Sequence, residues 1–281
     1  MIGTRGRTPR RRDRAPRIRG FVKNSDHIEL PAELSRIAGA PRERLARRLR
    51  EVMVGSAIVE RHVLATTLEA RALSKSFAGP PLFSDLSFDA GVGLTAVLGK
   101  NGSGKTTLLK ILAGLLRPGT GRVRVLDGGR ELREDDRRRS LGWAGPDLAF
   151  YEDFSARENL AFFRRAGGAR ADRAELDRLL ERVGLAGVGG RRVGAFSSGM
   201  KQRLRLAFAQ LFDSPVLLLD EPALGLDAEG RDLLSAIVRE RRRAGPVVLA
   251  SNDPRDFDRP EQTLELAGPG GSVLRQGASR V

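Results

Sequence analysis

The segment at residues 99–106, GKNGSGKT, constrains this chain more than any other feature of its sequence. An apolar run at residues 94–98 precedes it, and a helix-like run at residues 106–116 follows it. Glycines let the backbone curl so that successive N–H groups point inward, and the start of a helix favours an anion. The pattern G-x-x-x-x-G-K-[ST] between a strand and a helix therefore predicts a cradle for nucleotide phosphates.

Two side chains in this segment have distinct expected roles. Lys105 is placed to reach the β- and γ-phosphates of a nucleotide, and the Thr106 hydroxyl is placed to ligate Mg²⁺. We therefore predict that ATP and Mg²⁺ bind here. The predicted phosphate cradle consists of Gly99, Lys100, Asn101, Gly102, Ser103, Gly104, Lys105, Thr106 and Thr107.

Strand-like and helix-like patterns alternate through most of the chain. Such alternation predicts a parallel sheet covered on both faces. The expected strands are residues 68–72, 82–88, 94–98, 122–126, 216–219 and 247–250. The expected helices are residues 106–116, 156–163, 173–183, 199–211 and 228–244.

The positive charge is concentrated near the N-terminus. Residues 1–52 hold 15 Arg or Lys against 6 Asp or Glu. This excess of nine positive charges is most of the net charge of +15 of the whole chain. We expect residues 1–24 to be disordered and residues 42–54 to form a short amphipathic helix. Three interpretations of this extension stay open: a floppy tail, a true translation start near Met53, or a basic arm that touches anionic lipid or a partner.

Further segments carry the residues of a second anion site and of a catalytic centre. FSSGMKQRL, residues 196–204, places small residues and a hydroxyl at the start of an expected helix, which suits an anion but also suits an ordinary helix cap. PVLLLDEP, residues 215–222, ends an apolar strand in Asp220 and Glu221, which could alternatively cap the next helix.

In order and spacing these segments resemble those of the ATP-binding-cassette ATPases, and the likeness runs from about residue 67 to about residue 266. The resemblance implies a signature motif at Ser197, Ser198 and Gly199, although Ser198 and Met200 depart from its common form. In the family this motif grips the γ-phosphate bound to the opposite subunit, so a dimer is implied.

The resemblance also assigns roles at the nucleotide. Asp220 would hold Mg²⁺ through water, and Glu221 would polarise the attacking water. Asp227 would lie in the D-loop at the dimer interface. Phe77 would stack on adenine, and its alternative is a core phenylalanine.

Two polar residues expected in the family are missing. Pro146 stands where the Q-loop glutamine belongs, and no glutamine occurs between Met1 and Lys201. Asn252 replaces the switch histidine; its amide can still donate a hydrogen bond, so we group it with Glu221 and Lys105 as catalytic. The neighbouring Asp147 offers a carboxylate that could face Mg²⁺. We expect slow hydrolysis.

The resemblance implies an α/β fold: a P-loop NTPase with a RecA-like parallel-sheet core, an antiparallel β subdomain and a helical signature subdomain at about residues 147–205. Residues 67–281 would form this ATP-binding domain and residues 1–66 a basic extension.

The implied function is the ATP-hydrolysing subunit of a multi-chain transporter, located in the cytoplasm on the inner face of the cell membrane. No run of the sequence is apolar enough to span a bilayer, so a separate membrane-spanning permease is expected, together with a second ATPase copy. The motifs resemble exporters, including the haem-exporter type. The alternatives are a soluble cassette ATPase acting on nucleic acid or ribosomes, which the charge distribution does not favour, and a non-hydrolysing regulator.

Overall fold

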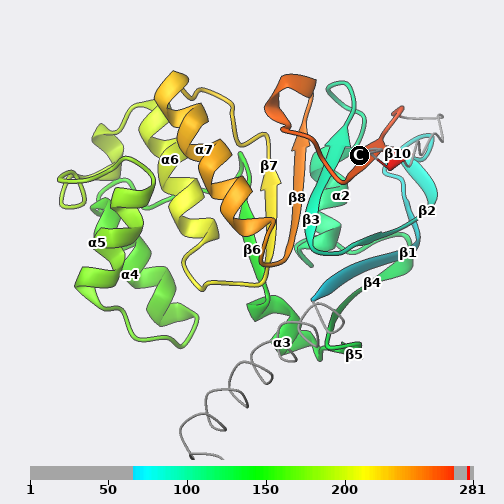
Figure 1. Cartoon of the computed structure of the whole chain (residues 1–281), viewed down its shortest axis with the longest axis horizontal. Coiled ribbons are helices and arrows are strands. Elements are labelled where there is room, and N and C mark those ends of the chain that lie inside the picture. Colours follow the sequence, from blue (N-terminus) through cyan, green and yellow to red (C-terminus); the bar gives the residue numbers. More distant parts are fainter. Residues whose placement is uncertain (1–65, 269–276, 279–281) are drawn as a thin grey trace, which may run out of the picture. The chain divides into compact units, whose positions relative to one another are not determined.

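The computed structural model describes residues 66–268 and 277–278, which form two sheets and the helices around them (Figure 1). The larger sheet has six strands in the order β10-β9-β3-β8-β7-β6, all parallel except β10, which runs antiparallel to β9. Its strands are β3 (Gly93–Leu98), β6 (Leu141–Ala144), β7 (Val216–Asp220), β8 (Pro246–Ser251), β9 (Gln262–Glu265) and β10 (Gly277–Ala278).

The smaller sheet is antiparallel and has the strand order β2-β1-β4-β5. It is the antiparallel β subdomain that the family resemblance implies. Its strands are β1 (Thr67–Lys75), β2 (Phe83–Ala90), β4 (Thr120–Asp127) and β5 (Arg130–Glu131).

Both faces of the parallel sheet are buried, because alternate residues of its central strands enter two different hydrophobic clusters. In β7, Val216 and Leu218 join the cluster formed with helix α2 and the antiparallel sheet, whereas Leu217 and Leu219 join the cluster formed with the helices α4 to α7. The helices are α2 (Lys105–Leu112), α3 (Glu134–Arg139), α4 (Ala156–Ala166), α5 (Arg173–Arg182), α6 (Ser198–Ala209) and α7 (Ala228–Arg241).

The structure confirms the predicted fold class and every expected helix and strand between residues 67 and 251. The prediction was wrong at the end of α2, which stops at Leu112 rather than at residue 116, and it missed α3, β5, β6, β9 and β10. Strand β6 is hard to recognise because it has only four residues and includes Gly142. A side chain there would lie 2.1 Å from the carbonyl oxygen of Ala209 on α6, so close packing requires this glycine.

The predicted helix at residues 42–54 and the other proposals about the extension lie outside the described residues. Among residues 66–268 and 277–278, no helix is long and apolar enough to cross a membrane.

Candidate nucleotide site

The phosphate loop joins β3 to α2, and its shape depends on glycines at two kinds of position. Gly102 and Gly104 have φ angles of 81° and 100°, in the left-handed region that side chains disfavour. At Gly99 a Cβ would meet the Ser103 hydroxyl oxygen at 2.3 Å and the Leu266 carbonyl oxygen at 2.7 Å. The loop therefore folds back on itself with no room for a side chain at its first position.

The start of α2 is built to receive an anion. Its N-cap residue, Gly104, supplies no side-chain hydrogen bond, and the first turn contains no acidic residue. The other four helices of eight or more residues within residues 66–268 are all capped by a side chain, from Ser155, Asp172, Ser197 and Asp227. Free N–H groups and the positive end of the helix dipole are therefore left for a ligand at α2.

Lys105 lies inside this loop and is only 5% exposed. Its Nζ atom donates to the carbonyl oxygens of Gly99 at 2.8 Å and Lys100 at 3.3 Å, and it lies 3.4 Å from Oε1 of Glu221. The loop backbone thus holds the ammonium group in place beside the catalytic carboxylate predicted from sequence.

Asp220, at the end of β7, is 1% exposed, and neither of its carboxylate oxygens has a hydrogen-bond partner of good geometry. Burial raises the pKa of this carboxyl group, while the neighbouring Thr106 hydroxyl and the Lys105 ammonium group oppose the rise. Buried polar atoms are normally satisfied, so two orphaned oxygens beside a threonine hydroxyl fit a hard cation such as Mg²⁺.

Glu221 follows Asp220 in an unusual backbone conformation, with a φ angle of 47°. Such strain in a residue other than glycine needs support from its surroundings. The Glu221 amide donates to the carbonyl of Ala250 at 2.9 Å, and the buried Ser251 hydroxyl lies 3.4 Å from Oε2. The conformation places the side chain against a cavity of about 250 Å³ lined by Leu82, Asn101, Gly102, Gly104, Lys105, Thr106, Thr107 and Glu221.

Asn252, at the position of the missing histidine, does not line this cavity but contacts a residue that does. Its amide donates to Oδ1 of Asn101 in the phosphate loop over 3.2 Å. Asp147, in contrast, is paired with Lys110 of α2, with 2.8 Å between Oδ2 and Nζ. This ion pair therefore competes with the arrangement considered from sequence, in which the Asp147 carboxylate faces Mg²⁺.

Phe77 is 63% exposed, which excludes the alternative of a core phenylalanine. The ammonium group of Lys75 lies 5.2 Å from the centre of its ring, a cation–π arrangement. An exposed ring of this kind is available for stacking, but Phe77 does not line the phosphate cavity. Its contact with adenine stays a prediction.

The signature residues form a second cavity, of about 380 Å³, which shares no residue with the first. Ser197 caps α6 by accepting a hydrogen bond from the Met200 amide at 3.2 Å. The alternative considered from sequence, an ordinary helix cap at Ser197, is therefore present in the structure. A Cβ at Gly199 would lie 3.1 Å from the carbonyl oxygen of Gly225. This cavity is lined by Gly184, Leu185, Ala186, Val188, Ser197, Ser198, Gly199, Met200, Arg203, Gly225 and Asp227.

Asp227, in the segment predicted to be the D-loop, contacts α6 of the same chain. Its Oδ1 atom accepts from Arg203 at 2.7 Å and from the Gly230 amide at 2.9 Å, and these two partners lower the pKa of the carboxyl group. Because Asp227 is the cap of α7, Asp220 and Glu221 are not, and the structure removes that alternative.

Sequence reasoning missed three polar side chains of α6 that connect these regions: Gln202, Arg203 and Arg205. Gln202 and Arg203 are 5% and 8% exposed, which is unusual for residues with amide and guanidinium groups. The signal was present in the sequence, because Gln202 and Arg203 lie on a helix with apolar neighbours and must find partners when buried.

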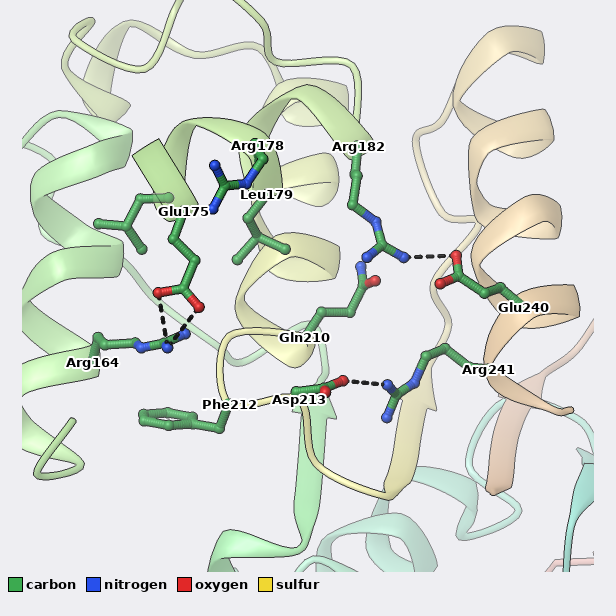
Figure 2. A pocket seen from close by; sticks show the side chains of 11 residues that line it. Arg164, Glu175, Arg178, Leu179, Arg182, Gln210, Phe212, Asp213, Glu240 and Arg241 are labelled. Atoms are coloured by element: carbon green, nitrogen blue, oxygen red, sulfur yellow. Dashed lines mark hydrogen bonds and ion pairs between the residues drawn. The ribbon is translucent and has the colours of Figure 1, made fainter. Parts of the chain in front are cut away.

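A separate polar cavity of about 470 Å³ lies among α4, α5, the loop before β7 and the end of α7 (Figure 2). Three ion pairs cross it or border it, from Arg164 to Glu175, from Arg182 to Glu240 and from Arg241 to Asp213. It contains none of the predicted site residues. We assign the chemistry to the smaller cavity at the phosphate loop, because the uncapped helix and the buried lysine line it and the orphaned carboxylate lies beside its Thr106.

Comparison with known proteins agrees with this geometry. Residues 83–224 match the family model described as ABC transporter. The chain is 39% identical over 192 residues to the cytochrome c biogenesis ATP-binding export protein CcmA of Xanthomonas campestris pv. campestris (strain 8004), covering 68% of this chain and 88% of the relative.

A second relative and a solved structure extend the comparison. Identity is 44% over 156 residues with the daunorubicin resistance ATP-binding protein DrrA3 of Streptomyces coeruleorubidus, covering 54% of this chain and about half (49%) of that protein. A solved structure described as the ATP-binding subunit of an ABC transporter superimposes with a TM-score of 0.65 at 27% identity, covering 75% of this chain and 90% of the other. The chain belongs to the ATP-binding-cassette family, as an ATP-binding protein of the ABC transporters.

Proposed function

We propose that this chain hydrolyses ATP with Mg²⁺ and powers export through a separate membrane-spanning partner. The observation that carries the proposal is the meeting of three features at one cavity. The uncapped start of α2 and the buried ammonium group of Lys105 line it together with Glu221, and the orphaned carboxylate of Asp220 lies beside Thr106, which also lines it. The CcmA relative is named as an export protein, which supports export as the direction of transport.

Different residues of the site bind the phosphates, bind the metal and orient the attacking water. The free N–H groups of α2 and the loop bind the phosphates, and Lys105 exchanges its carbonyl partners for phosphate oxygens. Thr106 and Asp220 would hold Mg²⁺, and the bound ion would supply positive charge to offset the negative charge of the phosphates. Glu221 accepts a hydrogen bond from the attacking water and orients it toward the γ-phosphorus.

We propose that two copies complete each site. Within one chain the signature cavity and the phosphate cavity share no lining residue, and both open to the surface. The capped start of α6 at Ser197 then reaches the γ-phosphate only from a second copy. Asp227 and Gly225 lie beside that start and would lie in the same interface.

The proposed membrane partner needs a docking surface, and α4 with the loop before it offers one. Three aromatic side chains there are exposed, Tyr151 at 50%, Phe154 at 42% and Phe162 at 40%. Phe154 and Phe162 line a groove of about 620 Å³ bordered by arginines. A cluster of exposed aromatics is typical of an interaction site.

We propose that turnover is slow because two contacts to the nucleotide are missing. Pro146 has neither an amide hydrogen nor a polar side chain. Asn252 can donate a hydrogen bond but cannot carry a proton. Phosphoryl transfer depends on positioning and charge stabilisation, so each loss should slow the reaction without abolishing it.

The test is to isolate the full chain from membranes with its bound partner and to measure phosphate release from the complex. The proposal requires a membrane-spanning partner, Mg²⁺-dependent phosphate release, and loss of that release in the Lys105→Ala variant. Nucleotide-driven dimerisation without any phosphate release would instead support the regulator. Salt-sensitive binding to nucleic acid by the cassette at residues 67–281 alone would support the soluble alternative.

A further inference from the structure

The segment at residues 146–148, where the family glutamine is missing, is held by two helices. Lys110 of α2 forms an ion pair with Asp147. Arg205 of α6 donates to the carbonyl oxygens of Pro146, from Nη2 at 3.1 Å, and Leu148, from Nε at 3.1 Å. The segment therefore connects the helix that begins at the phosphates to the helix that begins at the signature.

Arg205 also reaches the catalytic centre through one intermediate side chain. Its Nη1 atom donates to Oε1 of Gln202 at 3.0 Å. The amide nitrogen of Gln202 donates in turn to the carbonyl oxygens of Pro222 at 2.9 Å and Glu221 at 3.4 Å. A continuous series of hydrogen bonds thus runs from the backbone of the catalytic glutamate to residues 146–148.

Two physical features give this series a role beyond local stability. The backbone of Glu221 is in the left-handed region, so its carbonyl direction depends on the groups that hold it. Arg205 is partly buried yet has no ion-pair partner among the described residues, and its three acceptors are all uncharged. A guanidinium group presents several donors in a fixed plane, so it fixes three acceptors relative to one another.

We propose that Arg205 is a positioning residue that couples residues 146–148 to the backbone of Glu221 through Gln202, while the Lys110–Asp147 pair couples the same segment to α2. This arrangement supplies a link between the nucleotide site and the helical region that needs no glutamine side chain. The inference rests on the proposed ATPase function and specifies how its parts communicate.

Trp143 provides a direct probe of the segment. It is the only tryptophan of the chain, and a Cβ at Gly145 would lie 2.3 Å from its ring, so the backbone entering residues 146–148 contacts the indole. Its fluorescence can be followed in the Glu221→Gln background, in which nucleotide binds without turnover.

In that background we expect Arg205→Met to abolish the change in Trp143 fluorescence on adding Mg·ATP. The affinity for ATP should stay within about twofold, because Arg205 does not line the phosphate cavity. With Glu221 restored, kcat should fall about tenfold at nearly constant KM, since the positioning of Glu221 matters to the chemical step. Arg205→Lys should recover only part of kcat, because a lysine cannot bridge three acceptors.

The matched control is Arg182→Met, which removes a guanidinium group from α5 and its ion pair with Glu240 in the distant cavity (Figure 2). It should leave the Trp143 response and kcat unchanged. Asp147→Asn alters an exposed side chain and should fold normally, and it should halve the Trp143 response or reduce it further.

The proposal is overturned if Arg205→Met and Asp147→Asn both keep the full Trp143 response, or if Arg205→Met raises KM at unchanged kcat. If Arg205→Met fails to fold, Arg205→Lys and Asp147→Asn decide the question by the same readout. Failure of the ATPase function is recognised separately, because the parent chain would then release no phosphate and Glu221→Gln would change nothing.

Discussion

The starts of α2 and α6 are both suited to an anion, but they are built in opposite ways. At α2 no side chain caps the helix, and the buried Asp220 nearby lacks hydrogen-bond partners. At α6 the Ser197 hydroxyl caps the helix, and Arg203 is satisfied by Asp227 and Glu229 within the same chain.

This difference indicates an order of events. Unsatisfied buried groups at α2 gain hydrogen bonds or metal coordination when a ligand arrives, so this end should bind nucleotide by itself. The α6 end is already satisfied, so it gains little until a second cassette presents a bound phosphate. Binding and closure are thus assigned to different helices of the same chain.

The largest effect is expected for Glu221→Gln, which should slow hydrolysis without weakening the binding of ATP at the α2 end. Glu221→Gln keeps the size of the side chain but removes its ability to accept a proton, so we expect phosphate release to fall about 10²–10⁴-fold. ATP affinity should change little, because the neutral amide still fits the cavity. Phosphate release and ATP affinity are measured on the same preparation, and an unchanged rate would remove Glu221 from the mechanism.

Lys105→Ala should weaken binding itself. Hydrogen bonds to charged groups contribute about 1.5–3 kcal/mol, so the Kd for ATP should rise about 10–150-fold. Equilibrium titration with a fluorescent ATP analogue measures this change. Lys201→Ala, which removes a lysine from α6 and its pair with Glu152, is the matched control and should bind ATP normally. Equal losses in both variants would contradict the division between the two helices.

Asp220→Asn should lose Mg²⁺-dependent ATP binding and yet stabilise the free protein at neutral pH. Burial raises the pKa of Asp220 above its ordinary value of 3.8, so the native state binds more protons than the unfolded state over that interval. The stability of the wild type therefore falls as pH rises from about 3.8 through the raised pKa.

The expected gain for Asp220→Asn at neutral pH without Mg²⁺ is about 1–3 kcal/mol, the cost of an unsatisfied buried group. Thermal unfolding in EDTA at several pH values measures it. The difference from wild type should disappear below the ordinary pKa, where both side chains are neutral. A variant less stable than wild type at every pH would show that Asp220 is satisfied in the free protein.

The sequence predicted the fold and the α2 end because their signals are local. Glycine spacing, an apolar strand and a lysine define the phosphate loop, and the period-2 and period-3.6 patterns define most elements. The missed features depend on tertiary contacts. The backbone carbonyls that Gln202 and Arg205 bind lie 19 to 59 residues away along the chain, and no local pattern specifies such pairings.

The wrong prediction for the end of α2 has a different cause. Residues 113–116 continue an apolar, helix-like pattern, but Gly114 adopts a φ angle of 73° and the amides of Leu115 and Leu116 both turn back to the carbonyl of Lys110. Glycine in the left-handed region is a common helix terminator. The signal was therefore in the sequence, and the longer apolar pattern concealed it.

The smallest expected effect tests the α6 end. Ser197→Ala removes the cap of α6 and should lower the free energy of unfolding by about 0.5–2 kcal/mol. ATP affinity of the isolated chain should not change, because Ser197 does not line the phosphate cavity. Nucleotide-driven dimerisation of the Glu221→Gln protein should weaken, which sedimentation at several protein concentrations measures. Ser155→Ala removes the equivalent cap of α4 and is the matched control: it should cost similar stability and leave dimerisation intact. If both variants dimerise like the parent, the start of α6 is an ordinary helix cap and contributes nothing to closing the site.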